Sequence, residues 1–566
     1  MKDDNQKSCA ASHFQANWHE IDWNKANQKV RRMQARIVEA TKAKRWGKVR
    51  ALQHLLAHSF YGKALAVRRV TENQGKKTPG VDGIVWDTPQ AKTTAIASLK
   101  RHGYKPKPLR RVYIPKKNGK MRPLGIPTMN DRAMQALHLL ALEPVAETIG
   151  DTVSYGFRPK RSVADAIEQC FIGLARKGSA QWVLEGDIKA CFDGISHEWL
   201  ETNVPMDKTM LHKWLKAGYV EKGQLFPTEA GTPQGGIISP TLANIALNGL
   251  EAQLNARWGN KDKGYKIHLA RYADDFIVTG ASKEILEAGV RPLVEEFLKE
   301  RGLVLSSEKT LVTHITNGFD FLGFNIRKYP IGQSKYKLFI KPSKASVNKF
   351  LENIREIIRQ NPTMPAEGLI GLLNPKIRGW AMHYRLAVSK KVFSRVDHEI
   401  FKALWAWATR RHRNKGKRWI QKRYWRTIGR RHWVFASEGV NRKGKKTTFS
   451  LFKASDVNIK RHVKILNAAN PYDPQWEMYF ERRAYLQTLN KSFGQALSVL
   501  RQQEGKCPVC LQMLDGTPAD FHLHHKIPIV KGGSDRIENL IFVHPNCHNQ
   551  LHWKTAKESR ASIKAI

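Results

Sequence analysis

Two adjacent carboxylates stand between two runs of strand-forming residues in the segment Arg271-Tyr-Ala-Asp-Asp-Phe-Ile-Val-Thr279. Ile267 and Leu269 precede the pair, and the apolar run Phe276 to Val278 follows it. Runs of this kind joined by a short polar segment predict a β-hairpin. The acidic pair then lies at the exposed tip of the hairpin, where a ligand can reach it.

A second acidic cluster lies in Val183-Leu-Glu-Gly-Asp-Ile-Lys-Ala-Cys-Phe-Asp193, where Asp187 ends a short apolar strand and opens toward a turn. Carboxylate oxygens on two neighbouring strand ends form a cradle for Mg²⁺, which prefers hard oxygen ligands. Two such ions about 4 Å apart activate a 3′-hydroxyl and stabilise a departing pyrophosphate. The two clusters together predict a nucleotidyl-transfer site.

The chain is strongly basic, with 96 Lys and Arg residues against 49 Asp and Glu and a formal net charge of +47. Such a surplus repels itself unless a polyanion neutralises it, so nucleic acid is the expected partner. The segment Arg410 to Arg431 contains no acid and is interleaved with Trp and Tyr. The sequence contains no run of about 18 to 20 apolar residues, so it predicts no membrane span. The polar segment Met1 to Glu20 shows no secretory signal.

Three of the six cysteines cluster near the end of the chain. Cys507-Pro-Val-Cys510 is followed by His544-Pro-Asn-Cys547. Two pairs, each with a two-residue gap, have the spacing of a tetrahedral structural Zn²⁺ site. The other cysteines are scattered, which argues against a disulfide framework and for a reducing compartment.

The length of 566 residues predicts several domains, because it exceeds what a single core supports. Apolar residues at helical spacing predict helices over 21–70, 131–149, 347–358 and 393–410. An Asn-Gly turn at 118–119 predicts a hairpin over 110–127. Between 182 and 322 strand and helix patterns alternate, which is typical of a mixed α and β catalytic domain.

The box Tyr272-Ala-Asp-Asp275 resembles the Tyr-x-Asp-Asp box of reverse transcriptases. The family's other boxes follow in order, and they resemble Lys120-Met-Arg-Pro-Leu-Gly-Ile-Pro127, Ser154-Tyr-Gly-Phe-Arg-Pro159, Gly231-Thr-Pro-Gln-Gly-Gly-Ile-Ile-Ser-Pro240, Leu305-Ser-Ser-Glu-Lys-Thr310 and Phe319-Asp-Phe-Leu-Gly-Phe324. The resemblance runs from about residue 63 to residue 327. It implies a right-hand polymerase with fingers, palm and helical thumb that copies RNA into DNA from dNTPs.

The resemblance also implies a role for each matching position. Asp187, Asp274 and Asp275 would form the acidic triad that holds two Mg²⁺ ions. Asp274 is the stronger ligand candidate, because neighbouring residues on a strand point to opposite faces. The implied substrate-binding residues are Lys120 and Arg122 at the triphosphate, Phe192 against the sugar, Gln234 in the nucleotide pocket and Lys309 near the leaving phosphate. A ring at Phe192 would leave no room for a 2′-hydroxyl.

Downstream, Leu373-Asn-Pro-Lys-Ile-Arg-Gly-Trp-Ala-Met-His-Tyr-Arg385 and Lys417-Arg-Trp-Ile-Gln-Lys-Arg-Tyr-Trp425 resemble the thumb and maturase domain of group II intron-encoded proteins. Arg and Lys hold phosphate while aromatic rings stack on bases, so this region suits structured RNA or DNA. The residues expected to contact nucleic acid are Arg410, Arg411, Arg413, Arg418, Trp419, Arg423 and Trp425. A solvated basic helix would explain the charge but not the tryptophans.

The C-terminal unit resembles an HNH nuclease of the ββα-metal fold in Leu523-His-His-Lys-Ile-Pro528, Glu538-Asn-Leu540 and Cys547-His-Asn-Gln-Leu-His552. The resemblance implies that His525 is a general base, and that Asn539 orients it or completes the site. His524 and His548 would hold one catalytic Mg²⁺ or Mn²⁺, with His552 a weaker candidate. Cys507, Cys510, His544 and Cys547 would bind Zn²⁺, although many relatives have Cys in place of His544. A zinc ribbon that only binds DNA is the alternative.

The resemblances imply five domains: an N-terminal helical extension (1–62), fingers and palm (63–340), a thumb and maturase domain (341–415), a basic DNA-binding domain (416–496) and an HNH domain (497–566). The implied protein binds its intron RNA, assists splicing and remains with the lariat as a ribonucleoprotein. It cuts the second strand of a target DNA duplex, and the new 3′ end primes cDNA synthesis. These partners place it in the bacterial cytoplasm at the nucleoid, or in an organelle. A splicing chaperone without active enzymatic centres and a defence-associated reverse transcriptase are the alternatives.

Overall fold

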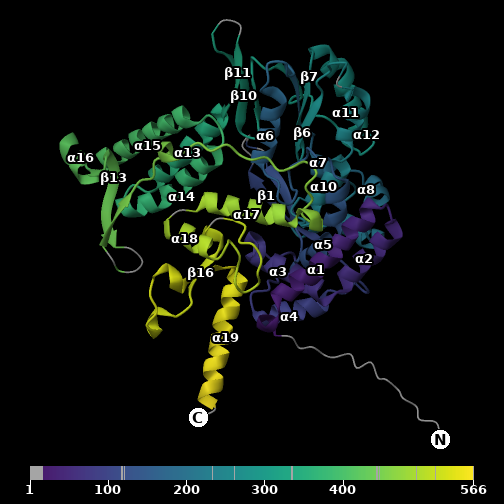
Figure 1. Cartoon of the computed structure of the whole chain (residues 1–566), viewed down its shortest axis with the longest axis horizontal. Coiled ribbons are helices and arrows are strands. Elements are labelled where there is room, and N and C mark those ends of the chain that lie inside the picture. Colours follow the sequence, from purple (N-terminus) through teal and green to yellow (C-terminus); the bar gives the residue numbers. More distant parts are fainter. Residues whose placement is uncertain are drawn as a thin grey trace.

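The computed structural model of the 566-residue chain describes residues 17–115, 119, 121–232, 234–260, 262–332, 335–440, 444, 446–492, 494–516 and 518–564. Residues 1–16, which belong to the segment expected to lack a secretory signal, lie outside these ranges. In the expected turn at 117–120, only Gly119 is described. Figure 1 shows helices and sheets mixed along the chain, which confirms the multidomain α+β class. No helix in the described ranges is both long and apolar enough to span a bilayer.

The N-terminal part is a layer of helices around α5 (Met129–Ile149). α1 (Trp23–Lys42), α2 (Trp46–His58) and α3 (Phe60–Glu72) contact α5, and α4 (Pro89–Ser98) contacts α3. α5 is buried along most of its length and around most of its circumference. Thr128 caps it by accepting a hydrogen bond from the backbone N–H of Asp131 (3.1 Å). The helices predicted over 21–70 and 131–149 are confirmed.

The predicted hairpin is formed by β1 (Leu109–Pro115) and β2 (Met121–Ile126), which pair in antiparallel register. β4 (Tyr219–Glu221) and β5 (Gln224–Phe226) extend it to a four-stranded sheet of order β2-β1-β4-β5. The loop Gly231–Gln234 reaches this sheet, because the backbone N–H of Gly125 in β2 donates to the carbonyl of Gln234 (2.8 Å). The fingers are therefore tied to a loop that the sequence places next to the nucleotide.

The palm is an antiparallel sheet of order β6-β7-β3-β8. Its strands are β3 (Trp182–Gly186), β6 (His268–Tyr272), β7 (Asp275–Gly280) and β8 (Leu311–His314), and its helices are α6 (Val163–Leu174), α7 (Cys191–Gly194), α8 (His197–Asn203), α9 (Lys208–Leu215), α10 (Ser239–Leu247), α11 (Leu250–Trp258) and α12 (Arg291–Lys299). Gly186 pairs with Phe276, and a Cβ at 186 would lie 2.2 Å from the Phe276 ring. Glycine therefore allows this register, which puts Asp187 beside the turn between β6 and β7.

The thumb follows a small antiparallel sheet formed by β9 (Phe319–Phe321), β10 (Phe324–Pro330) and β11 (Tyr336–Pro342). The elements of the thumb are α13 (Lys344–Gln360), α14 (Ala366–Tyr384) and α15 (Lys390–Arg411). The basic region after residue 415 begins with α16 (Lys417–Tyr424), β12 (Trp425–Ile428), β13 (Arg431–Val440) and β14 (Lys446–Ser450). The Trp425 ring lies 4.8 Å from Trp405 and 5.4 Å from Phe435, measured between centroids. The helices and the sheet that follows them therefore share one aromatic core.

Residues 451–476, which we call the strap, run from the thumb across the molecule to α17 (Glu477–Lys491) (Figure 1). The strap is anchored on α6 by Asp165, whose side chain is fully buried. One carboxylate oxygen of Asp165 accepts from the backbone N–H of Ile465 (2.8 Å), His462 Nε2 (2.8 Å) and Arg483 Nη2 (2.6 Å). The strap therefore packs on the palm as a part of its structure.

The C-terminal domain contains α18 (Gly494–Gln502), β15 (His522–His525), β16 (Leu540–Val543) and α19 (Pro545–Lys564). β15 and β16 pair in antiparallel register, with His525 opposite Leu540, and α19 follows β16 directly. The predicted ββα arrangement is therefore present. Figure 1 shows α19 extending from this domain past α4 of the N-terminal helices.

Candidate functional site

The two acidic clusters meet where β3 ends and the β6–β7 hairpin turns. Asp275 opens β7 opposite Tyr272, and Ala273 adopts a left-handed conformation (φ 58°) that makes the turn tight. Asp187 follows β3, the next strand of the sheet. Among the described residues, groups of three or more ligand atoms within 4.8 Å of one another occur only in the C-terminal domain. The three palm carboxylates therefore lie near one turn, but their oxygens are not all within 4.8 Å of one another.

The electrostatics of the palm acids show that they share one site. Partial desolvation, followed by the charges of Asp274 and Asp187, raises the pKa of Asp275 to about 6. Desolvation and the charge of Asp187 also raise the pKa of Asp274, while Arg122 and Lys309 oppose the rise. Such mutual repulsion is relieved by a multivalent cation, so the donor set fits Mg²⁺.

Two residues that the sequence did not single out hold the catalytic turn from behind. Gly156 lies against the turn so closely that a Cβ there would be 2.3 Å from the backbone nitrogen of Ala273. Arg271, 1% exposed, donates to the Asn244 side chain (3.2 Å), the Asn248 side chain (3.0 Å) and the Ala273 carbonyl (3.4 Å). The box 154–159 therefore supports the turn. The only sequence signal for this role is that the box occupies its usual position in the order of the reverse transcriptase boxes.

The predicted nucleotide-binding residues lie around the same turn. Phe192, half-buried on α7, packs edge to face against Phe157 with centroids 5.9 Å apart. Gln234 Nε2 donates to the two carboxylate oxygens of Asp193 (3.2 and 3.1 Å). Gly231 allows this approach, because a Cβ there would lie 2.5 Å from the Phe192 carbonyl oxygen. Phe192 and Gln234 are thus brought together through the loop 231–235.

Two of the three cations expected at the triphosphate, Lys309 and Arg122, lie near the palm acids. Lys309 Nζ donates to Asp187 Oδ2 (2.7 Å), and this hydrogen bond raises the pKa of Lys309. Arg122 is exposed on β2, and its charge opposes the rise in the pKa of Asp274 that desolvation causes. Lys120 lies outside the described residues. The structure therefore brings two of the three predicted cations to the acids.

The basic segment of the thumb divides into exposed cations and core rings. Arg410, Arg411, Arg413, Arg418 and Arg423 are exposed, and so is Trp419, with 39% of its surface accessible. Arg411 also donates to the carbonyl of Met364 (2.7 Å), so it holds the end of α15. Trp425 is only 3% exposed in the aromatic core. Its predicted role as a base-stacking residue is wrong, because no face of its ring is free.

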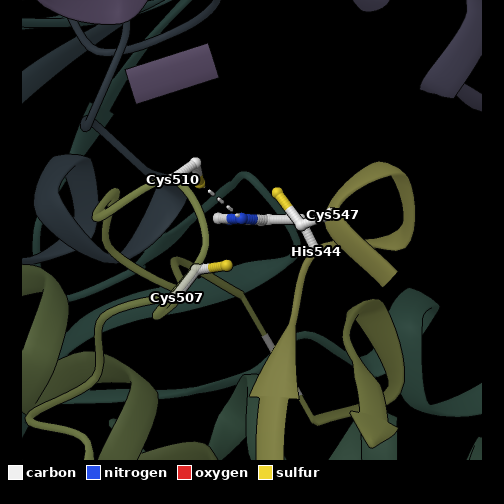
Figure 2. Close-up of side chains that lie close together, drawn as sticks. All are labelled: Cys507, Cys510, His544 and Cys547. Atoms are coloured by element: carbon white, nitrogen blue, oxygen red, sulfur yellow. Dashed lines mark hydrogen bonds between the residues drawn. The ribbon is translucent and has the colours of Figure 1, made fainter. Parts of the chain in front are cut away.

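The C-terminal domain brings Cys507, Cys510, His544 and Cys547 together with their ligand atoms within 4.8 Å (Figure 2). His544 Nδ1 lies 3.3 Å from Cys510 Sγ, so histidine takes the position of a fourth cysteine. Hydrogen bonds from Cys510 and Cys547 lower the pKa of Cys507. Burial acts to lower the pKa of His544, but hydrogen bonds with Cys507 and Cys510 raise it to about 9. Three thiols and one imidazole in this arrangement fit tetrahedral Zn²⁺.

A second cluster consists of His524 on β15 and His548 and His552 on α19, also within 4.8 Å of one another. His548 Nε2 and His552 Nε2 are 3.2 Å apart. Burial, followed by the charges of His552 and other neighbouring histidines, lowers the pKa of His548 to about 4. Neutral imidazoles are the form that binds metal, so the cluster fits a divalent cation. His552 belongs to it as fully as His524 and His548.

His525 and Asn539 lie beside this cluster with separate partners. His525 Nε2 is 2.9 Å from Asp535 Oδ1, a contact that was not predicted. Asn539 donates to the carbonyls of Ile527 (2.9 Å) and Ser534 (2.8 Å) and accepts from the Ile527 N–H (2.8 Å). Asn539 therefore closes the loop that follows His525, which makes it a positioning residue.

Family models match four parts of the chain. "N-terminal domain of reverse transcriptase" matches residues 18–99 and "Reverse transcriptase (RNA-dependent DNA polymerase)" matches 114–326. "Group II intron, maturase-specific domain" matches 347–425, and "HNH endonuclease" matches 507–554. The order of the matches is the order in which the polymerase, thumb and nuclease follow one another in the structure.

The chain is also similar to two known proteins. The chain is 37% identical over 305 residues to Protein YkfC of Escherichia coli (strain K12), covering 46% of this chain and 79% of that protein. It is 31% identical over 412 residues to Group II intron-encoded protein LtrA of Lactococcus lactis subsp. cremoris, covering 60% of this chain and 64% of LtrA. A telomerase structure from Candida albicans shares 12% identity and a TM-score of 0.32 with the chain, over 57% of this chain and 65% of that one. The chain belongs to the group II intron-encoded proteins and contains reverse transcriptase, maturase and HNH endonuclease domains.

Proposed function

We propose that this protein copies its intron RNA into DNA at a target site that its own nuclease has cut. In this cycle it assists splicing, stays with the lariat RNA, and cuts one strand of the duplex after the RNA has inserted into the other. The new 3′ end then primes cDNA synthesis. The observation that carries the proposal is that one chain holds the palm acids, an exposed basic thumb and the nuclease histidines in one packed body.

The palm residues would perform nucleotidyl transfer. Mg²⁺ bound between Asp187, Asp274 and Asp275 would polarise the 3′-hydroxyl and neutralise the charge on the pyrophosphate. Asp187 would be held for this role by β3 and by its hydrogen bond from Lys309 (2.7 Å), whose ammonium would stand near the leaving phosphate. The fixed turn keeps Asp274 in place, which supports catalysis by positioning.

The nucleotide would lie between the palm turn and the fingers. Arg122 and Lys120 would bind the triphosphate, and the half-buried Phe192 ring would stand against the sugar and select dNTPs. Gln234 would line the same pocket, held by its hydrogen bonds to Asp193. Because the loop of Gln234 is tied to β2, movement of the fingers is coupled to the pocket.

The HNH residues would cut DNA with His525 as the base. Asp535 accepts the proton of His525 Nε2 in the tautomer that leaves Nδ1 free to take a proton from water. His524, His548 and His552 would hold a single Mg²⁺ or Mn²⁺ at the scissile phosphate. Asp535 and Asn539 would position the base and its loop, and Zn²⁺ at Cys507, Cys510, His544 and Cys547 would hold the domain together.

The nucleic-acid partners would be the intron RNA and the target duplex, contacted by Arg410, Arg413, Arg418, Trp419 and Arg423. Their exposure on α15, on α16 and between these helices leaves them free to bind phosphates and a base. The location would be that of the target DNA, which is the cytoplasm of a bacterium at its nucleoid, or an organelle.

Substitution of each centre separately tests the proposal. Asp274→Ala should abolish primer extension on an RNA template and leave RNA binding near normal, because the carboxylate holds metal. His525→Ala should stop nicking of duplex DNA with zinc content and reverse transcription unchanged. Asp262→Ala, an exposed acid away from the turn, is the matched control. Extension by pure Asp274→Ala would overturn the polymerase assignment, and nicking by His525→Ala at the wild-type rate would overturn that of the nuclease.

A further inference from the structure

The nuclease domain is docked on the first described residues of the chain. Trp18, 1% exposed, donates from Nε1 to Asn546 Oδ1 on α19 (2.9 Å). Gln550, one turn further along α19, donates from Nε2 to the carbonyls of His19 (3.0 Å) and Ile21 (2.9 Å). Asn546 and Gln550 are themselves buried, so these hydrogen bonds are shielded from water. Buried polar pairs of this kind fix one relative position of two elements.

The contact continues along α19 and around the zinc cluster. The His19 ring stacks on Trp553 with centroids 5.6 Å apart, and Lys557 pairs with Glu20 (3.1 Å). On the other side, Arg68 of α3 pairs with Glu72 (3.1 Å). Burial acts to lower the pKa of Arg68, but the charge of Glu72, followed by those of Cys547 and Cys510, raises it, so Arg68 lies near the zinc cluster. The N-terminal helices therefore hold both the zinc cluster and the metal-binding helix of the nuclease.

A cavity of about 420 Å³ opens beside this contact, with the nuclease histidines on one wall. α19 contributes His548, Asn549 and His552. The opposite wall belongs to the polymerase part of the chain and consists of Trp18, His19, Asp87, Pro89 and Lys92. The cavity therefore lies between the nuclease histidines and a wall of the polymerase part.

Lys92 has an unusual environment for a lysine. Its side chain is partly buried, and its ammonium lies 5.4 Å from the centroid of the Trp18 ring. The ammonium forms no hydrogen bond or ion pair with another residue in the parts of the chain that the structure describes. A lysine removed from water is ordinarily paired with an anion. The free ammonium beside metal-binding histidines therefore points to an anionic ligand in the cavity.

We propose that Lys92 binds a backbone phosphate of the DNA strand that enters the HNH site, so that the nuclease site is completed by the polymerase part of the chain. The inference rests on the proposed nuclease function and names one more residue for its substrate. An ammonium is a strong donor to phosphate, and Trp18 holds it in place.

The other polar groups of the cavity are consistent with this assignment. Burial, followed by the charge of Lys92, lowers the pKa of His19, so the charged form of His19 is disfavoured beside the Lys92 ammonium. Asp87 is the one acid on the wall, and it is exposed at the rim. Burial lowers the pKa of Lys92, and the charges of Glu72 and Asp87 act against this lowering.

Docking then controls cutting, because Lys92 is at the nuclease site only while α19 holds the N-terminal segment. A nuclease domain that has moved away keeps its histidines and its zinc but lacks this phosphate contact. The isolated C-terminal domain is thus expected to bind and cut DNA more weakly than the full chain.

Lysine footprinting on the full-length protein tests the contact independently of cutting. The zinc-loaded protein is acetylated with and without a short DNA duplex, in buffer with no added magnesium or manganese, and each lysine is followed by mass spectrometry. We expect the duplex to slow the acetylation of Lys92 roughly tenfold or more, and Lys100, exposed beyond the end of α4, is the internal reference. Equal acetylation of Lys92 with and without the duplex would overturn the proposal.

Nicking kinetics then separate the phosphate contact from the nuclease itself. Lys92→Met should raise the KM for duplex nicking roughly tenfold or more, Lys92→Arg should restore it, and Lys100→Met should leave it unchanged. Asn546→Leu with Gln550→Leu should reproduce the Lys92→Met effect while primer extension is retained. Wild-type kinetics in Lys92→Met would refute the composite site and leave the nuclease standing. Protection of Lys92 in a wild-type protein that does not nick would support the binding site and refute the nuclease.

Discussion

Gly156→Ala should damage the polymerase although residue 156 touches no substrate. The added Cβ would lie 2.3 Å from the nitrogen of Ala273 and 2.8 Å from the carbonyl carbon of Tyr272, both in backbone. Backbone cannot rotate away as the end of a side chain can, so the turn that carries Asp274 must shift. Overpacking of this kind costs about 1–3 kcal/mol of unfolding free energy. A displacement of about 1 Å at the reacting groups costs roughly 100-fold in rate.

The assay is single-turnover primer extension on an RNA template, together with thermal unfolding of the same samples. We expect the rate to fall by about 100-fold in a protein that is still folded at the assay temperature. Gly173→Ala in α6 is the matched control, because a Cβ there meets no atom within 4 Å. This control should stabilise the helix by roughly 0.5–1 kcal/mol and leave extension unchanged. A folded Gly156→Ala protein that extends at the wild-type rate would refute the account of how the turn is held.

Three further predictions concern charge, packing and metal. Because the pKa of Asp275 is raised to about 6 in the folded protein, its ionised form destabilises the fold, so Asp275→Asn should raise the melting temperature at pH 7.5 without magnesium. The gain should vanish below about pH 4, where the carboxyl is protonated in both states, and a gain that persists there would contradict the assignment. Trp425→Ala should lower the unfolding free energy by about 3–5 kcal/mol, whereas Trp419→Ala should weaken RNA binding in a filter assay at unchanged melting temperature. Cys507→Ala should lose zinc by elemental analysis and become sensitive to trypsin after Lys506, with primer extension retained because the palm is a separate core.

The features predicted from sequence are those whose signal lies within a few neighbouring residues. The hairpin that carries Asp274 and Asp275 needs only a polar turn between two β-type runs. The zinc cluster needs only two pairs of residues at fixed spacing. In each case short-range geometry already places the side chains, so folding has only to bring two such segments together.

The features that were missed depend on contacts between distant segments. Gly156 supports the turn because the chain returns beneath it more than a hundred residues later. Trp425 seemed free for stacking because it stands among cations, yet Ile420 and Tyr424 are also buried and define the inner face of α16. Gln550 has no distinguishing sequence context in α19, and its role follows only from its hydrogen bonds to the carbonyls of His19 and Ile21. No periodicity in the sequence reports any of these contacts.

The separation between the nuclease and the polymerase is set by packing and not by a free linker. The strap that joins them is clamped where Asp165, fully buried, accepts from Ile465, His462 and Arg483, and α19 is clamped by Trp18. Substituting one partner of a buried ion pair costs about 3–5 kcal/mol, so the anchor of the strap is part of the stability of the fold. In the proposed cycle the cut DNA end must therefore travel to the palm by movement of the DNA along the basic surface. A surplus of positive charge along the whole chain would support this movement, because Lys and Arg can hold the DNA backbone at many places.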